Sequence, residues 1–505
     1  MRFFIVPGLF ILFSILSLGV FSAEVQWTLT TLNRENLLNS KPSFSFETTA
    51  SNNAFVINVD SSKKYQTMRG IGSSMEASTC FNLNRLTKDR RQEVYQKLFD
   101  EENGIGLNLM RITIGTSDFC PLPFYSYDDM PAGSKDPLLR NFNTTADESY
   151  IIPILQEVLQ YSKTQVSGGK NKDDLQFFAS PWSGPGFMKT SDKLEGGSLL
   201  PTSDESYSNY LLQFIKTYRD HYKIPVIAIT PQNEPLANQE YPSILLPPGH
   251  ERDIISNSLG AKLLKESIEI WCFDHNWNTL FYPRTILNDS TSYQYVSGTA
   301  FHGYRGQPTA MTELHEQFPD KDIYFTEGST FGIRGAIKIV EILRNWARTY
   351  NAWVTILDTE LQPNAGPFNP QPTMIQIDAQ EPNDQEIIYN FEFFMYGQFS
   401  KFIRRGAIRI GSEDAQESEK RVPSPQIESL QDAIIDAKKA RSNDEEDDGR
   451  LRIHHIAFQE NEKTTLIVVN PFQEEQLISI VDVVLFAGQS AQVTVPPLSV
   501  STFVW

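Results

Sequence analysis

The sequence predicts an α/β fold: a (β/α)8 TIM barrel with an accessory all-β domain built from N- and C-terminal segments. From residue 65 to 360, apolar runs typical of buried strands alternate with amphipathic helical stretches. Eight such runs occur, which is the number that a closed barrel requires. Both ends of the chain carry short runs rich in Val, Ile, Thr, Ser and Phe, which are typical of antiparallel strands. An open doubly wound sheet is the alternative, and the count of eight favours the barrel.

The predicted barrel strands are continuously apolar, as expected for strands buried on both faces of a parallel sheet. They cover residues 68–72, 107–113, 175–180, 226–230, 268–273, 296–301, 323–326 and 352–357. The helices between them place apolar residues at three- and four-residue steps. Tyr207, Tyr210, Phe214 and Tyr218 form one such face, after Ser203, which is a suitable N-cap.

Changes in composition divide the chain into segments. They are a signal peptide (1–23), N-terminal strands of the β-domain (24–64), the catalytic barrel (65–400), a connection (401–411), an acidic insertion (412–449) and C-terminal strands of the β-domain (450–505). The insertion ends in the acidic run 444–448, which is typical of a solvated loop, and residues 426–440 are compatible with a short helix.

The composition excludes several classes of protein. The 505 residues are 21% charged and 40% apolar, which is ordinary for a globular chain and rules out disorder or a coiled coil as a description of the whole. The net charge of −18 repels phosphate backbones, so no nucleic-acid partner is predicted. The chain lacks a P-loop, an H-E-x-x-H motif and a G-x-S-x-G motif, and the glycines at 70 and 72 lack the third glycine of a dinucleotide fingerprint. We therefore predict no cofactor and no metal.

The N-terminus resembles a secretory signal peptide. Arg2 is followed by an apolar stretch over residues 3–21 and then by small residues, and an uncleaved signal anchor is the alternative. Secretion would make Asn143 and Asn288, both in N-x-[ST] sequences, glycosylation acceptors. Cys80, Cys120 and Cys272 are few and widely spaced, so we expect buried free thiols rather than a zinc site, although one disulfide is possible.

Two glutamates follow predicted strands at the barrel mouth. Glu234 lies in Thr-Pro-Gln-Asn-Glu-Pro after the fourth strand, and Glu327 lies in Phe-Thr-Glu-Gly after the seventh. Catalytic residues of such barrels lie at the carboxyl ends of the strands. Two carboxylates facing each other there are what retaining glycoside hydrolysis requires, one as nucleophile and the other as acid/base. Most glutamates are surface acids, but two that end apolar strands fit that description poorly.

Other strand exits carry groups suited to a sugar. Trp182 and Trp353 offer aromatic faces, although tryptophan more often belongs to a core. Candidate hydrogen-bonding groups for sugar hydroxyls are Glu76, Asp118, His302 and Tyr304, each of which could instead be structural.

These residues carry a resemblance to glycoside hydrolase family 30, and within it to the glucosylceramidases, over nearly the whole mature length. The motifs are Gly-Ile-Gly-Ser-Ser-Met-Glu-Ala (70–77), Met-Arg-Ile (110–112), Ser-Asp-Phe (117–119), Ala-Ser-Pro-Trp (179–182), Asn-Glu-Pro (233–235), Phe-His-Gly-Tyr (301–304), Thr-Glu-Gly (326–328) and Gln-Phe-Ser-Lys-Phe-Ile (398–403). Asn-Glu-Pro alone is shared by many barrel glycosidases, whereas the ordered set is specific.

The resemblance implies a retaining β-glycosidase that hydrolyses β-glucosylceramide to glucose and ceramide through a covalent glucosyl-enzyme. It implies Glu234 as acid/base, Glu327 as nucleophile, and Asn233 as the partner of the sugar 2-hydroxyl. The implied glucose pocket is lined by Arg111, Trp182, His302, Tyr304 and Trp353. The alternatives are a secreted polysaccharide hydrolase of the same family, acting on β-1,6-glucan or xylan, and an inactive carbohydrate-binding relative.

The chain departs from the family pattern in three places. Glu76 stands where the family has Asp, Val354 where it has Asn, and the loop over residues 358–368 is longer. The sugar chemistry is therefore better supported than the leaving group. The resemblance implies a secreted or lysosomal enzyme that acts on a glycolipid or oligosaccharide, with peripheral contact to a lipid surface in the glycolipid case. The sequence specifies no activator protein.

Overall fold

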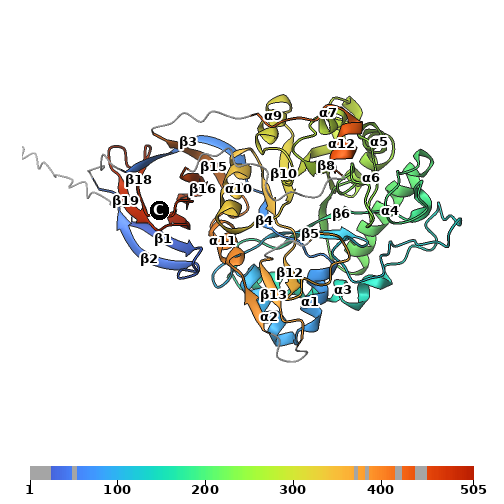
Figure 1. Cartoon of the computed structure of the whole chain (residues 1–505), viewed down its shortest axis with the longest axis horizontal. Coiled ribbons are helices and arrows are strands. Elements are labelled where there is room, and N and C mark those ends of the chain that lie inside the picture. Colours follow the sequence, from blue (N-terminus) through green and yellow to red (C-terminus); the bar gives the residue numbers. More distant parts are fainter. Residues whose placement is uncertain (1–23, 48–53, 369–372, 381–385, 416–422, 438–451) are drawn as a thin grey trace, which may run out of the picture.

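The computed structural model describes residues 24–47, 54–368, 373–380, 386–415, 423–437 and 452–505, which form a barrel beside an all-β domain (Figure 1). The predicted signal peptide and the acidic run 444–448 lie outside these residues. No helix in the described part of the chain has the length and apolar character needed to cross a membrane. Cys80, Cys120 and Cys272 are buried free thiols, as expected from their spacing.

Eight parallel strands make the barrel. They are β4 (Gly70–Gly72), β5 (Leu109–Ile114), β6 (Gln176–Pro181), β7 (Val226–Ile229), β8 (Glu269–Asn276), β9 (Val296–His302), β10 (Asp322–Glu327) and β11 (Thr349–Asn351). β5 to β10 form one continuous parallel sheet and β11 pairs with β4. Isolated parallel bridges, Ser74 to Arg111 and Ile323 to Ala347, join the pair to both edges of the sheet. The predicted barrel is confirmed.

The eighth strand was predicted in the wrong place. The apolar run 352–357 predicted it, but β11 precedes that run, and residues Ile356–Asp358 form β12 of a small separate sheet. The partners of β12 there are β13 (Ile375–Ile377) and β14 (Ile387–Tyr389). β11 has the sequence Thr-Tyr-Asn, and its polar side chains hydrogen-bond to the backbone of neighbouring strands. Thr349 donates to the Phe325 carbonyl and Asn351 to the Leu109 carbonyl. A strand that buries polar side chains this way leaves no apolar run in the sequence.

Helices surround the barrel. They are α1 (Ala77–Arg85), α2 (Lys88–Phe99), α3 (Ile151–Ser167), α4 (Asp204–Lys216), α5 (Pro248–Ile254), α6 (Gly260–Lys265), α7 (Phe281–Leu287), α8 (Ser290–Tyr295), α9 (Thr309–Gln317), α10 (Gly332–Arg344) and α11 (Phe391–Ser400). Short π-helical turns, Thr217–His221 and Ile255–Leu259, continue α4 and α5. Short 3-10 turns occur at Thr145–Ser149, Gly186–Met188 and Pro201–Ser203. In α10 the buried residues Ile333, Ala336, Val340 and Leu343 repeat at helical spacing, which explains how this helix packs.

The second domain is a nine-stranded sheet assembled from distant segments. Its order is β19-β18-β3-β15-β16-β17-β20-β1-β2. The strands are β1 (Glu24–Thr31), β2 (Asn39–Ser45), β3 (Phe55–Thr67), β15 (Ile408–Asp414), β16 (His454–Glu460), β17 (Lys463–Asn470), β18 (Gln476–Asp482), β19 (Ala491–Val495) and β20 (Ser499–Val504). Residues 408–414, assigned above to the connection and the insertion, are a strand of this sheet. Figure 1 shows the blue N-terminal strands beside the red C-terminal strands, as predicted from the amino-acid composition of both ends of the chain.

Buried polar contacts join the two domains. Arg344 at the end of α10 donates to the carbonyls of Ser412 and His455 in the sheet. Gln398 of α11 donates to Thr30 and accepts from Thr502, and all three side chains are buried. α10 and α11 therefore form a shared layer between barrel and sheet.

Candidate active site

A layer of side chains from six barrel strands fills the barrel interior. It consists of Leu109, Phe178, Ala228, Trp271, Ala300 and Tyr324. Because side chains alternate along a strand, the residue two positions further on faces the same interior. For five of these strands that residue is Arg111, Ser180, Thr230, His302 or Thr326, and all five are buried at the carboxyl end of the barrel. The strand period thus places a polar cluster directly above an apolar floor.

β8 contributes Asp274 to this cluster through a bulge. The pairing with β9 shifts register between Phe273 and His275, and φ is 79° at Phe273 and 57° at Asp274. The Asp274 carboxylate is fully buried and accepts from Thr230 at 2.7 Å and Thr326 at 2.6 Å. Burial alone would raise the pKa of Asp274, but Arg111 and His302 hold it well below its ordinary value of 3.8. Asp274 was not predicted from the sequence, although it follows a strand as Glu234 and Glu327 do.

Arg111 is the centre of the cluster. Its guanidinium donates to the Glu327 carboxylate, to Oδ1 of Asn233 at 2.8 Å and to Oδ2 of Asp274 at 2.8 Å. Its Nε donates to Ser180 at 3.1 Å. The planar fork of donors can hold all of these acceptors at once, which a lysine could not do.

Glu327 is oriented by two donors. The pairing of β10 with β9 shifts register between Phe325 and Glu327, so Thr326 and Glu327 both reach the same cluster although they are neighbours in the chain. Tyr304 donates to Oε1 of Glu327 at 2.8 Å, while Arg111 donates to Oε2. With 1% of its side chain exposed, Glu327 is not a surface acid.

Glu234 lies in a strained turn after β7. Its φ is 43°, an uncommon value for a residue with a side chain, and such strain concentrates at functional sites. Its backbone N–H donates to the Asp274 carbonyl at 3.0 Å, and the preceding Asn233 N–H donates to the Pro181 carbonyl at 2.9 Å. The turn is therefore fixed to the ends of β8 and β6.

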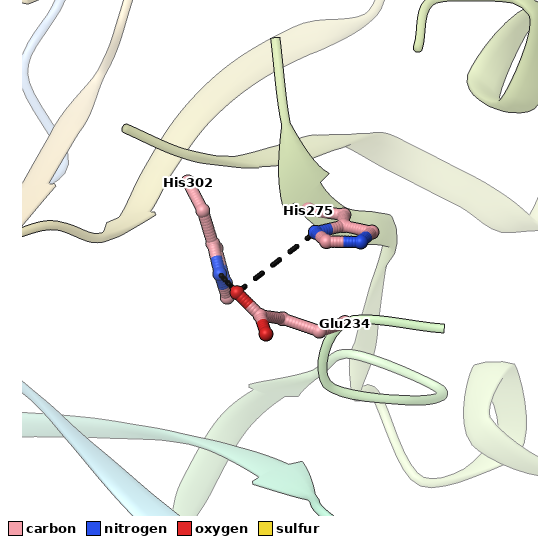
Figure 2. Close-up of side chains that lie close together, drawn as sticks. All are labelled: Glu234, His275 and His302. Carbon is pink, nitrogen blue, oxygen red and sulfur yellow. Dashed lines mark hydrogen bonds and ion pairs between the residues drawn. The ribbon is translucent and has the colours of Figure 1, made fainter. Parts of the chain in front are cut away.

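His302 lies between the two glutamates. Figure 2 shows its ring and that of His275 directed at Glu234, at 3.2 Å and 3.9 Å from Oε1. The other ring nitrogen of His302 lies 3.0 Å from Asp274 and 3.9 Å from Oε2 of Glu327. Burial would lower the pKa of His302, but Glu327 and Asp274 raise it to about 9. The ring is thus an imidazolium at neutral pH and donates to both Glu234 and Asp274.

Glu234, His275 and His302 also offer metal-ligand atoms within 4.8 Å of one another. An imidazole must be neutral to ligate a metal ion, and the raised pKa of His302 opposes this. Within the trio the hydrogen bond is the one between His302 and Glu234, at 3.2 Å, whereas Nδ1 of His275 lies 3.9 Å from Glu234.

Aromatic rings form one wall of the site. Trp182 and Trp353 stack with centroids 4.9 Å apart, and the guanidinium of Arg111 lies 4.7 Å from the Trp182 ring. Phe119 contacts Trp353 edge-on at 5.9 Å. The indole N–H of Trp353 is buried without a hydrogen-bond partner among the described residues.

Two further predicted binding residues, Glu76 and Asp118, make other contacts. Glu76 is the N-cap of α1, where it accepts from the Thr79 N–H at 2.9 Å, and burial raises its pKa to about 7. Asp118 lies next to Phe119, and its carbonyl accepts from Ala365 and Gly366 of the longer loop. A Cβ on Gly366 would lie 2.6 Å from that of Asp118, so the loop packs closely over this residue.

The structure brings together most of the predicted site. Hydrogen bonds, ion pairs and ring contacts connect one group of these residues: Arg111, Trp182, Asn233, Glu234, His302, Tyr304, Glu327 and Trp353. Their roles in binding or catalysis remain predictions. Glu76 is a helix cap in this structure, and no contact joins it to the group within the described residues.

The sequence and the fold match those of known glycoside hydrolases. Relatives include a lysosomal acid glucosylceramidase from mouse, 29% identical over 69% of this chain and 70% of its own. An endo-1,6-β-D-glucanase from Neurospora crassa is 29% identical over 72% of this chain and 76% of its own. Among solved structures, SrfJ from Salmonella typhimurium has a TM-score of 0.79 at 22% identity and covers 96% of this chain and 99% of its own.

The barrel itself carries the family match. Residues 68–403, from just before β4 to just after α11, match the glycosyl hydrolase family 30 TIM-barrel domain. Together with the barrel, the strand-exit glutamates and the accessory sheet, this establishes that the chain belongs to glycosyl hydrolase family 30.

Proposed function

We propose that the protein is a retaining β-glycosidase in which Glu327 is the nucleophile and Glu234 the acid/base. The observation that carries the proposal is that both glutamates contact the ring of His302, at 3.9 Å and 3.2 Å. They thus face one shared space at the mouth, as a pair acting on opposite sides of one glycosidic bond must do.

The chemistry takes place in two steps. Glu327, oriented by Arg111 and Tyr304, attacks the anomeric carbon while Glu234 protonates the glycosidic oxygen, and the leaving group departs with that proton. Glu234 then takes a proton from water, whose oxygen attacks the anomeric carbon and releases the sugar from Glu327. His302 lies beside both glutamate side chains throughout, at 3.2 Å from Glu234 and 3.9 Å from Glu327.

Asn233 supports this assignment. Its amide oxygen is occupied by Arg111, which leaves its NH2 group as the donor for a sugar 2-hydroxyl. Trp182 and the free indole N–H of Trp353 supply an aromatic face and a donor for the same sugar.

We propose β-glucosylceramide as the substrate, hydrolysed to glucose and ceramide. The support is the ordered motif set and the similarity to the mouse glucosylceramidase over 70% of its length. This substrate would bring the barrel mouth to a lipid surface, and secretion or lysosomal delivery would fit the exposed glycosylation sequences at Asn143 and Asn288.

A β-1,6-glucan is the second candidate. The Neurospora crassa endo-1,6-β-D-glucanase and an Aspergillus fumigatus enzyme of the same name are as similar to this chain as the mouse enzyme is, at 29% and 30% identity. The two candidates share one sugar chemistry and differ in the leaving group, so the proposed mechanism holds for both.

The test uses the purified full chain at mildly acidic pH with three substrates: β-glucosylceramide in detergent, β-1,6-glucan and an aryl β-glucoside. Glu327→Gln is the matched variant. Release of glucose and ceramide by the wild type alone supports the lipid substrate, and release of oligosaccharides alone supports the glucan. Activity on the aryl glucoside alone moves the substrate elsewhere. Inactivity on all three would make the chain a carbohydrate-binding relative.

A further inference from the structure

A segment of the insertion leaves the β-domain and packs on the barrel mouth. It comprises residues 423–437 and includes α12 (Leu430–Ala437), and it lies between β15 and β16 in the sequence. Figure 1 shows the orange-red α12 among α5, α7 and β8 of the barrel, far from β15 and β16. The predicted solvated loop therefore holds, in its described part, a docked segment.

The docking is apolar on one side. Ala433 is 2% exposed, and Ile427, Leu430, Ile434 and Ala437 pack against the barrel core. Leu430, Ala433, Ile434 and Ala437 lie on one face of α12, and Ile427 precedes the helix. Because the apolar residues are on one side and the central alanine is buried, this segment packs specifically against the barrel.

Polar contacts connect the segment to three loops of the mouth. Asp436 accepts from Asn278 at 3.0 Å in the loop after β8 and pairs with Arg305 at 3.4 Å in the loop after β9. Gln239, in the loop after β7, donates to the Ala437 carbonyl at 3.0 Å. Both charged side chains of the ion pair are largely buried.

The packing is also close at the other end of the segment. Gly306 has a φ of 81°, and a Cβ there would lie 3.0 Å from the Ser424 hydroxyl. Ser424 accepts from the Gln307 N–H at 2.9 Å, and the Ile427 N–H donates to the Asn278 carbonyl at 2.8 Å.

These loops carry the residues next to the leaving group. The loop after β7 carries Glu234, which in the proposed function protonates the leaving oxygen, and Arg305 directly follows Tyr304. We propose that residues 423–437 form the wall of the substrate cleft on the leaving-group side and determine how the enzyme binds the part of the substrate beyond the cleaved bond. This inference rests on the proposed function.

The physical reason is that contacts far from the cleaved bond contribute binding energy only for substrates that extend that far. A ceramide or a glucan chain extends past Glu234 and meets the loops that the segment holds. An aryl leaving group is too short to do so. Loss of the segment should therefore raise KM for a large substrate and leave hydrolysis of a small one nearly unchanged.

The experiment compares three variants with the wild type. One replaces residues 423–437 with a Gly/Ser sequence of equal length, and the second is Asp436→Ala. The control is Gln431→Ala, on the exposed side of α12. Each is assayed on an aryl β-glucoside and on whichever of β-glucosylceramide and β-1,6-glucan the wild type cleaves, and thermal unfolding confirms that each variant is folded.

We expect the replacement to raise KM for the large substrate about 10-fold or more, Asp436→Ala to raise it about 3- to 10-fold, and both to change kcat/KM for the aryl glucoside less than about 2-fold. Equal losses on both substrates, or no loss on either, would overturn the inference while leaving the proposed function intact. A wild type inactive on every substrate would overturn the proposed function and the inference together.

Discussion

Nη2 of Arg111 lies 2.8 Å from Oδ2 of Asp274, and both side chains are buried inside the barrel mouth. The same guanidinium donates to Glu327 and Asn233, while the other oxygen of Asp274 accepts from His302. One carboxylate that belongs to neither proposed catalytic role therefore orients the groups that hold both glutamates.

Asp274→Asn should disable the site and destabilise the fold. The variant leaves the buried charges of Arg111 and His302 undercompensated, and breaking a buried ion pair from one side costs about 3–5 kcal/mol. Urea unfolding and kcat/KM measure the two effects. Asp220→Asn is the control, since Asp220 pairs with Arg219 at the surface, where an ion pair is screened by solvent and contributes little to stability. Equal stability of the two variants would contradict the central role of Asp274.

The charge of His302 predicts a pH dependence of stability. Its pKa in the folded protein is about 9, above the ordinary value of 6.5, so the folded state binds the proton more tightly than the unfolded state. The stabilisation is complete below the unfolded pKa and is lost as the pH rises through the folded pKa. By the shift of the pKa it amounts to about 3 kcal/mol. Unfolding of the wild type between pH about 6 and about 9.5 should show this decline, and His302→Gln should lack it.

Tyr304→Phe should lower kcat far more than it raises KM. The phenol donates to Oε1 of Glu327 at 2.8 Å, and a hydrogen bond to a charged group contributes about 1.5–3 kcal/mol, or about 10- to 100-fold in rate. Steady-state kinetics with an aryl β-glucoside measures the effect. Tyr293→Phe removes a similar bond to Asp320 at the surface and should leave kcat unchanged. A purely structural role for Tyr304 would instead lower the melting temperature with kcat preserved.

Glu234→Gln should slow hydrolysis most for substrates whose leaving group needs a proton in order to depart. General acid catalysis contributes about 100- to 10,000-fold, so a glycoside with a poor leaving group should lose about that much. When the leaving group is an acidic phenol, it departs as the phenolate without needing a proton. The first step with such an aryl glucoside should therefore be nearly unaffected. A series of aryl glucosides of increasing phenol pKa tests this. Equal loss across the series would argue against Glu234 as the acid.

Most of the barrel could be predicted because buried parallel strands have continuously apolar sequences. β5 to β10 all match such runs within a few residues. This pattern is absent from β11, where the polar side chains of Thr349 and Asn351 are buried and donate to backbone carbonyls. The sequence pattern also fails for the insertion, whose composition is that of a solvated loop while residues 423–437 are docked by one narrow apolar face.

Glu234 and Glu327 were predictable because each follows an apolar run within a recognisable motif, even though Glu327 also lies at a register shift. Asp274 was missed because a bulge, with positive φ at Phe273 and Asp274, turns it inward, and single-strand patterns do not reveal a bulge. Glu76 was predicted to bind sugar hydroxyls, and this stays a prediction. In the structure one oxygen of its carboxylate caps α1, a role that the strand-exit pattern does not indicate.

The order of strands in the sheet has a consequence for biosynthesis. β1 pairs with β20, and β3 lies between β15 and β18, so strands made first wait for partners that lie beyond the whole barrel in the sequence. A nascent chain on the ribosome therefore carries exposed strand edges throughout synthesis of the barrel, and such edges recruit wrong partners. Completion of the sheet depends on the final strand, Ser499–Val504. A chain truncated before this strand would keep every active-site residue described above and still lack the strand that pairs with both β17 and β1.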